Sequence, residues 1–319
     1  MSDPRLTRNE SGDRKGETVR RFRLVGSGGQ PHQPDPRTEA GDPGAGLRVI
    51  GIASPKGGVG KSHLALNLAV ALARRGRQAL LVDGAPGLHQ LNLLTGAEPT
   101  HDVTHVLAGT RRLDEVVILG PEGIRYLPAA SSGQEAPAYD AEIATRLLPL
   151  LGGFAIPGDI VLVDLPGGIH PQALDLASVC GEILLVTTPE LPSWLHAVTL
   201  MKRMPRAAFR VVVNRVRTVQ EAADTFARIV AASLDALADA PTYWGYVSED
   251  PAVQEAVRRQ RPFVLIAPGA PASRQIEKLA RRVTEEEPPG TRRRAARPLA
   301  ASEIESLRES DPVPVWKAA

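Results

Sequence analysis

Short runs of apolar residues, rich in Val, Ile and Leu, recur along the middle of the chain with little polar alternation. Strands need such runs when helices cover both faces of their sheet, so the pattern predicts a mostly parallel sheet. The predicted strands are 47–53, 78–82, 160–163, 183–186, 209–213 and 243–247. Helical patterns lie between them, such as residues 63–75, which are followed by Gly76 as at many helix C-termini. The chain is therefore expected to form an α/β fold, a doubly wound sheet with helices on both faces.

Residues 116–128 depart from this pattern. Two short apolar pieces flank the sequence Gly-Pro-Glu-Gly at positions 120–123. Such turn-forming residues between apolar pieces are typical of a β-hairpin, so a small hairpin is predicted here.

The two ends of the chain are much less apolar than its middle. Residues 1–46 contain eight Gly, five Pro and fifteen charged residues, but only six large apolar side chains. Residues 285–290 read Glu-Glu-Glu-Pro-Pro-Gly, and three arginines follow at 292–294. Segments with so little apolar surface cannot offset the entropy lost on ordering. We therefore expect disordered tails at 1–46 and 284–319, and one α/β domain at 47–283.

Charge and cysteine content exclude several classes of protein. The chain has 38 Lys and Arg against 36 Asp and Glu, a net charge of +2, which gives no strong nucleic-acid signature. The single cysteine, Cys180, cannot form an intrachain disulfide framework or a cysteine-ligated metal site. No apolar run reaches the roughly 18 residues of a spanning helix, and residues 284–319 lack the apolar stripe of a direct membrane anchor. A cytoplasmic protein is expected.

A glycine-rich loop, Ser-Pro-Lys-Gly-Gly-Val-Gly-Lys-Ser at 54–62, directly follows the first predicted strand and precedes a helix. Its glycines allow a tight turn whose N–H groups point inward, which forms an anion site at a helix N-terminus. Lys61 supplies a positive charge for the β- and γ-phosphates, and Ser62 supplies a hydroxyl for Mg²⁺. The predicted ligand is a nucleoside triphosphate.

This loop resembles the deviant Walker A pattern, Lys-Gly-Gly-x-Gly-Lys-Ser/Thr, of the MinD/ParA family of dimeric ATPases. Lys56 matches the family lysine that reaches across a nucleotide-sandwich dimer, so the resemblance implies an ATP-dependent homodimer. Residues 80–83 resemble the family's second strand, which ends in Asp83, and residues 161–168 resemble its Walker B strand with Asp164.

The resemblance continues over roughly residues 49–283. Residues 211–214 resemble the strand whose terminal Asn214 lies near the adenine base. Residues 118–130, 243–263 and 271–273 are similar to the flagellar-number regulator (FlhG/FleN-like) branch. The resemblance implies ATP and Mg²⁺ as cofactors and a protein partner in polar or flagellar machinery, through which the chain reaches the inner face of the membrane or a cell pole.

The motif positions give a set of expected site residues. Catalytic roles are expected for Lys56, Lys61, Asp83 and Asp164. Nucleotide binding is expected for Pro55, Lys56, Gly57, Gly58, Val59, Gly60, Lys61, Ser62, Gly167 and Asn214. The expected Mg²⁺ ligands are Ser62, Asp83 and Asp164.

One position departs from the family pattern at the expected catalytic site. Ala85 stands where the family has the second Asp of an Asp-x-Asp sequence, which orients or activates the attacking water. Alanine has no oxygen for that task, and such general-base contributions commonly amount to about 10²–10⁴-fold in rate. His89 is a candidate substitute base, although a lone loop histidine is more often a solvated residue. Slow or absent hydrolysis is expected.

Three functions remain open on the sequence. The favoured function is an ATP-binding, weakly hydrolysing dimerisation switch that positions a flagellum, polar machinery or division apparatus. The same fold could act as a non-hydrolysing, ATP-loaded scaffold. A ParA-like DNA-partitioning ATPase is the third alternative, and it would bind duplex DNA in a salt-dependent manner.

Overall fold

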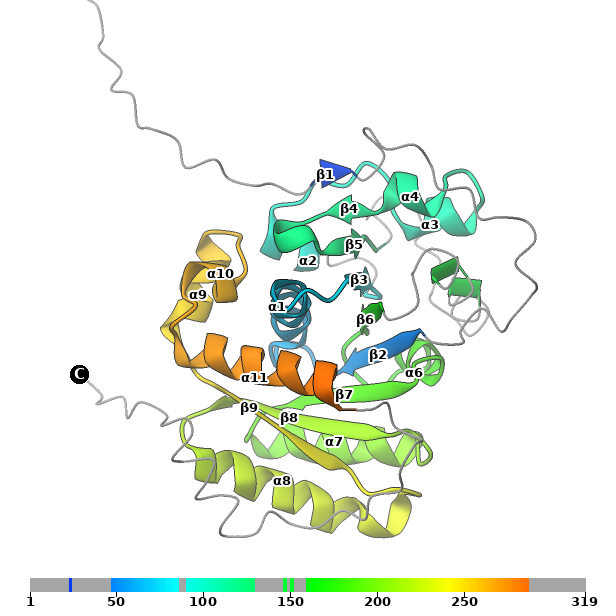
Figure 1. The fold of residues 1–319 in the computed structure, drawn as a ribbon. Coiled ribbons are helices and arrows are strands. Elements are labelled where there is room, and N and C mark those ends of the chain that lie inside the picture. Colours follow the sequence, from blue (N-terminus) through cyan, green and yellow to red (C-terminus); the bar gives the residue numbers. More distant parts are fainter. Residues whose placement is uncertain are drawn as a thin grey trace, which may run out of the picture.

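The computed structural model describes residues 23–24, 47–85, 90–129, 146–147, 150–151 and 159–286. Their strands form one nine-stranded sheet in the order β1-β4-β5-β3-β6-β2-β7-β8-β9 (Figure 1). The pairs β1–β4 and β4–β5 are antiparallel, and the other neighbouring strands are parallel. The strands are β1 Arg23–Leu24, β2 Arg48–Ala53, β3 Ala79–Asp83, β4 Ile118–Leu119, β5 Arg125–Leu127, β6 Ile160–Asp164, β7 Glu182–Thr187, β8 Phe209–Val216 and β9 Thr242–Ser248.

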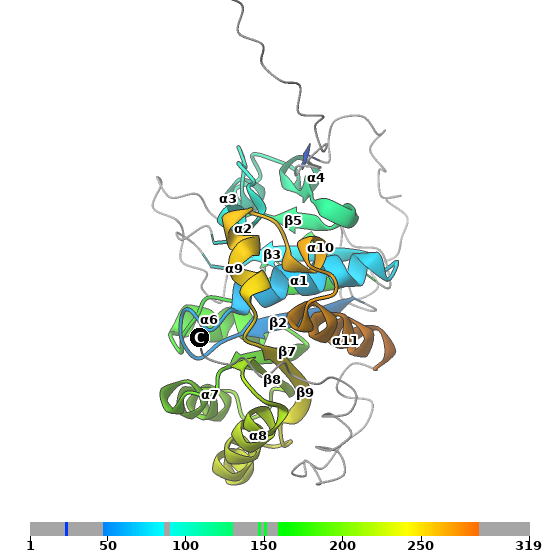
Figure 2. The same ribbon diagram turned by 90° about the vertical axis from the view of Figure 1, so that its left-hand side faces the viewer.

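Helices cover both faces of this sheet (Figures 1 and 2). One face is buried by α1 (Lys61–Arg74), α2 (Gln90–Thr95), α9 (Pro251–Arg258), α10 (Phe263–Ile266) and α11 (Pro271–Glu285). The other face is buried by α3 (Val103–Leu107), α4 (Leu113–Val116), α6 (Pro171–Ser178), α7 (Leu191–Arg203) and α8 (Val219–Ser233). The predicted doubly wound, mostly parallel α/β fold is confirmed.

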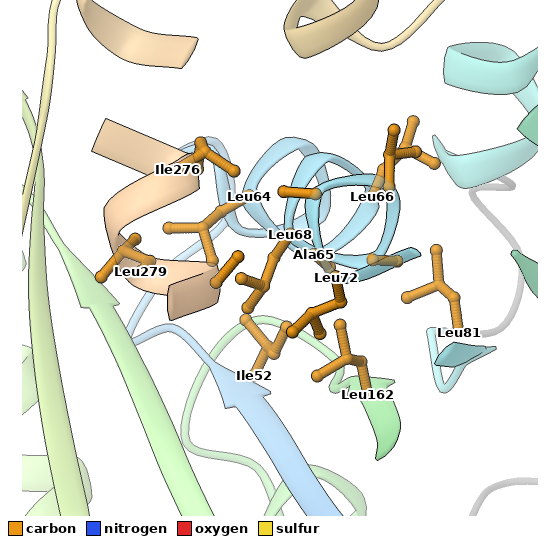
Figure 3. Packing of buried hydrophobic residues seen from close by; sticks show 14 of the residues in the cluster. Ile52, Leu64, Ala65, Leu66, Leu68, Leu72, Leu81, Leu162, Ile276 and Leu279 are labelled. Carbon is orange, nitrogen blue, oxygen red and sulfur yellow. The ribbon is translucent and has the colours of Figure 1, made fainter. Parts of the chain in front are cut away.

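Helix α1 is buried on nearly all sides, which fits its run of Leu, Ala and Val residues. Figure 3 shows it between the sheet, where Ile52 and Leu162 lie, and α11, which contributes Ile276 and Leu279. The burial of α1 fixes the position of its N-terminus, at which the glycine-rich loop ends.

All six predicted strands are present, and the predicted helix at 63–75 corresponds to α1. The predicted hairpin is present as the antiparallel pair β4–β5, joined through a short 3₁₀ helix at Pro121–Gly123. The predicted tail boundaries remain predictions, because most of residues 1–46 and 287–319 lie outside the described residues. Within the described residues, Arg23–Leu24 pairs with β4, and α11 continues to Glu285, two residues past the predicted boundary.

The strand order places three loops together at one edge of the sheet. Strand β2 lies between β6 and β7, and β6 lies between β2 and β3. Ile52 and Asp83 both pair in register with Asp164. Because these strands are parallel, their carboxyl ends meet at this edge, the usual place for a ligand in open α/β sheets.

Candidate functional site

The glycine-rich loop connects β2 to α1 and is held from outside by Asn214 at the end of β8. The Asn214 Nδ2 atom donates a hydrogen bond of 2.7 Å to the carbonyl of Val59. Gly60 has a φ of 93°, and a Cβ atom there would lie 2.3 Å from the Asn214 amide nitrogen. Glycine is therefore required at position 60 both by backbone conformation and by the close approach of Asn214.

The segment after β6 lies directly against the same loop. The backbone N–H of Gly168 donates a hydrogen bond of 3.0 Å to the carbonyl of Ser54. A Cβ atom at Gly167 would lie 3.4 Å from the backbone nitrogen of Gly57. The small residues at 167 and 168 thus let the strand-end backbone approach the glycine-rich loop closely.

Lys61 and Asp164 form a buried ion pair at the start of α1. The Lys61 Nζ atom lies 2.5 Å from Asp164 Oδ1, and the two side chains are 9% and 1% exposed. The same ammonium lies 3.5 Å from the Ser62 hydroxyl. Each of these charges neutralises the other in a site that water barely reaches.

Asp83 is the second buried carboxylate of the site and is 2% exposed. Its Oδ1 atom accepts a hydrogen bond of 3.0 Å from the Ala85 backbone N–H, and its Oδ2 atom accepts one of 3.4 Å from the Tyr126 hydroxyl. Burial, followed by the nearby negative charge of Asp164, raises the pKa of Asp83 to about 7.

The raised pKa of Asp83 gives a test of stability against pH. The folded protein binds this proton more tightly than the unfolded chain, whose carboxyl has the ordinary value of 3.8, so Asp83 destabilises the fold increasingly between pH 3.8 and about 7. We expect Asp83→Asn without nucleotide to melt at a higher temperature than the unsubstituted protein at pH 8, and at nearly the same temperature at pH 4. Thermal unfolding followed by circular dichroism measures this difference. An equal difference at both pH values would contradict it.

Lys61, Ser62, Asp83 and Asp164 form a buried cluster, and helix α2 contacts both sides of it. The Ser62 hydroxyl donates a hydrogen bond of 3.3 Å to Gln90 Oε1. The Tyr126 hydroxyl donates one of 2.5 Å to Asn92 Oδ1.

Ala85 presents only its backbone N–H to Asp83, and the candidate base His89 lies outside the described residues.

Lys56 occupies a different position from Lys61. It lies on the rim of the loop, where its Nζ atom forms an ion pair of 2.5 Å with Glu190 Oε2, and the side chains are 35% and 59% exposed. Hydrogen bonding and charge attraction from Lys56 lower the pKa of Glu190. This lysine thus points away from the buried cluster and remains accessible.

The carboxylate and hydroxyl oxygens at the site suit Mg²⁺, which prefers hard oxygen ligands. Ser62, Asp83 and Asp164 converge there. Among the described residues, no cluster of three or more His, Cys, Asp or Glu side chains is placed to hold a metal ion. The site therefore fits an ion that takes one or two protein carboxylates and completes its shell with phosphate and water oxygens.

The structure brings together the expected residues from four strand ends: the glycine-rich loop, Asp83, Asp164 with Gly167, and Asn214. Two contacts escaped the sequence analysis. Tyr126 is an apolar-strand residue whose hydroxyl reaches Asp83, and Glu190 is the partner of Lys56. Neither contact has a signal in the sequence, because each joins residues that lie far apart along the chain.

Residues 50–263 match the family described as the CobQ/CobB/MinD/ParA nucleotide binding domain. This chain belongs to that family. The MinD/ParA resemblance inferred from the phosphate loop is thereby confirmed, and with it the class of P-loop ATPases.

Two similar proteins are named as an antiactivator and as a flagellum site-determining protein. The chain is 32% identical over 241 residues to the antiactivator FleN of Pseudomonas aeruginosa, covering 74% of this chain and 86% of FleN. It is 28% identical over 240 residues to the flagellum site-determining protein YlxH of Helicobacter pylori, covering 73% of this chain and 80% of YlxH. These relatives support the predicted flagellar-regulator branch of the MinD/ParA family.

A solved MinD structure shows the same fold. The septum site-determining protein MinD of Pyrococcus horikoshii, complexed with Mg-ADP, matches with a TM-score of 0.61 and 25% sequence identity. The match covers 75% of this chain and 96% of that protein. In the described part of this MinD/ParA member, no helix is long and apolar enough to span a membrane.

Proposed function

We propose that this protein is an ATP- and Mg²⁺-binding dimerisation switch. The observation that carries the proposal is the placement of its two loop lysines. Lys61 lies inside the buried cluster, whereas Lys56 lies 35% exposed on the rim, where it can reach a second subunit. Two leucines of α7 beside this rim, Leu191 and Leu195, are also 59% and 42% exposed, which suits burial against a second copy.

The buried residues divide the binding task among them. Lys61 leaves Asp164 and turns its ammonium toward the β- and γ-phosphates, while the loop N–H groups hold the phosphate oxygens. Asp164 is then free to serve, with Ser62 and Asp83, as a metal-site group. When bound, Mg²⁺ neutralises charge on the phosphates. Asn214 holds the loop through Val59 and borders the expected adenine position.

The relatives suggest the process that the switch serves. YlxH is named a flagellum site-determining protein and the P. horikoshii protein a septum site-determining protein. We therefore propose that the ATP-loaded dimer positions a cellular structure, with flagellar or polar machinery as its protein partner. In this proposal the protein works in the cytoplasm and reaches the inner face of the membrane or a pole through that partner.

The dimer is tested by replacing Lys56. We expect the unsubstituted protein to elute as a dimer with ATP and Mg²⁺ and as a monomer with ADP, whereas Lys56→Ala stays monomeric with ATP. Both proteins should bind ATP, because Lys61, not Lys56, contacts the buried cluster. Size-exclusion chromatography with light scattering gives the mass. The matched control is Lys202→Ala, an exposed lysine at the far end of α7. A monomer for the unsubstituted protein with ATP would contradict the switch.

Ala85 favours a second function, that of an ATP-loaded scaffold which does not hydrolyse its nucleotide. The alanine side chain offers no oxygen to a water molecule, and its backbone N–H is already bonded to Asp83. Such a scaffold would dimerise with ATP in the same way but would remain loaded. The rate of single-turnover hydrolysis by the purified protein separates the two functions.

A further inference from the structure

Tyr126 brings a hydroxyl into the metal site from a neighbouring strand. It lies on β5, which is parallel to β3, and it pairs in register with Leu81. Residues two apart on a strand share a face, so Tyr126 lies on the same face of the sheet as Asp83. Its side chain is fully buried. The hydroxyl is thus held close to the Asp83 carboxylate by the sheet itself.

The two oxygens of Asp83 face different donors. The Ala85 N–H bonds Oδ1 at 3.0 Å, and the Tyr126 hydroxyl bonds Oδ2 at 3.4 Å. Hydrogen bonds to both oxygens restrict rotation of a carboxylate more than a bond to one oxygen alone. Tyr126 therefore orients the oxygen that Ala85 does not reach.

The same hydroxyl connects Asp83 to α2. It lies 2.5 Å from Asn92 Oδ1, and two residues earlier Gln90 accepts a hydrogen bond from Ser62. Helix α2 thus contacts one expected metal ligand directly through Gln90 and another through Tyr126. A phenol has a single proton, so Tyr126 donates to Asn92 or to Asp83 but not fully to both at once. The shorter contact is to Asn92, and Asp83 Oδ2 is the second acceptor within reach of the same hydroxyl.

We propose that Tyr126 is a positioning residue for Mg²⁺: its hydroxyl orients Asp83 toward the ion and ties that orientation to α2. The proposal rests on the ATP- and Mg²⁺-binding function proposed above. Groups that hydrogen-bond a metal ligand set its direction, and their loss typically lowers metal affinity or activity by about 10–100-fold. The nucleotide itself should bind as before, because Tyr126 does not contact the phosphate loop in the described hydrogen bonds.

The test separates Mg²⁺ binding from nucleotide binding. Fluorescent mant-ATP is titrated into the protein in EDTA, and then Mg²⁺ is titrated into the complex. For Tyr126→Phe we expect the dissociation constant for mant-ATP in EDTA to stay within about twofold of that of the unsubstituted protein. The half-saturating Mg²⁺ concentration should rise about tenfold or more. Phenylalanine keeps the volume of the buried ring, so the fold is retained, and the melting temperature checks it.

Tyr243→Phe is the matched control. Tyr243 lies in the core on the opposite face of the sheet, and its buried hydroxyl has no hydrogen-bond partner among the described residues. Its Mg²⁺ midpoint should equal that of the unsubstituted protein. An unchanged Mg²⁺ midpoint in a folded Tyr126→Phe protein, or equal shifts of the midpoint in both variants, would overturn the proposed role of Tyr126. Neither result would affect the proposed ATP- and Mg²⁺-binding function. Absence of mant-ATP binding by the unsubstituted protein at every Mg²⁺ concentration would overturn the proposed function as well.

Discussion

Replacing Ala85 with aspartate is expected to raise ATP turnover by about 100-fold, because a positioned general base typically contributes about 10²–10⁴-fold. The new carboxylate would follow Gly84, whose N–H bonds the carbonyl of Asp164, so it would enter the same edge of the sheet as Asp83. The nearby carboxylates of Asp83 and Asp164 would raise its pKa above the ordinary value of an aspartate, which makes it a stronger base toward water. Single-turnover release of phosphate from ATP measures the rate.

Ala85→Asn is the matched control for this gain. An amide has nearly the shape of a carboxylate and can hold a water molecule by hydrogen bonding, but it cannot accept the proton. We expect its turnover to lie well below that of Ala85→Asp and close to that of the unsubstituted protein. If the unsubstituted protein hydrolysed ATP measurably and as fast as Ala85→Asp, hydrolysis would not need a carboxylate at position 85. That result would exclude the scaffold function.

The sequence was sufficient for the fold and for the strand-end residues of the site. Unbroken apolar runs predicted the central strands, and parallel strands place their carboxyl ends together whatever their exact order. Hence the loop at 54–62, Asp83 and Asp164 could be assigned to one edge before their distances were known.

The contacts between distant residues could not be predicted in the same way. Tyr126 is 43 residues from Asp83, and Glu190 is 134 residues from Lys56, so both contacts depend on which strands are neighbours. The hairpin at 116–128 was predicted, but not that its second strand would lie against β3. Side-chain hydrogen bonds at the site follow from that order, which periodicity does not encode.

Glu182 shows a second limit of apolar patterning. The predicted strand began at residue 183, the first apolar residue of its run. In the structure, β7 begins at Glu182, whose side chain is 1% exposed. It lies 2.6 Å from Arg48 Nε on β2 and 2.7 Å from Arg210 Nε on β8. A charged residue can therefore occupy this interior strand, because arginines on the two neighbouring strands neutralise it.

The group of Arg48, Glu182 and Arg210 also connects the last helix to the sheet. Arg48 donates hydrogen bonds to the carbonyls of Val283 and Glu286, at the C-terminal end of α11. The Arg210 guanidinium lies 4.2 Å from the ring centroid of Trp244, a favourable cation–π distance. The carboxylate of Glu182 is thus the central negative charge between two arginines that hold three strands and α11 together.

Glu182→Gln is expected to lower the free energy of unfolding by about 3 kcal/mol, because removing one partner of a buried ion pair leaves uncompensated charge and typically costs about 3–5 kcal/mol. Glutamine keeps the volume of the side chain, so the loss reports charge rather than a cavity. Urea unfolding followed by circular dichroism measures it. Glu255→Gln removes a surface partner of Arg258 and Arg259 at the C-terminal end of α9 and should leave the unfolding midpoint unchanged.

A triple replacement separates the charge from the packing. Arg48→Met, Glu182→Leu and Arg210→Met together remove every charge of the cluster that meets Glu182 and keep most of its volume. Replacing a buried ion group with apolar residues is often neutral or stabilising. Glu286, which also pairs with Arg210, keeps Arg282 as a partner. We therefore expect this variant to recover most of the stability that Glu182→Gln loses. A loss below about 1 kcal/mol for Glu182→Gln would mean that water or movement of the arginines already relieves the charge. A triple variant less stable than Glu182→Gln would instead assign the stabilisation to the hydrogen bonds that Arg48 makes to α11.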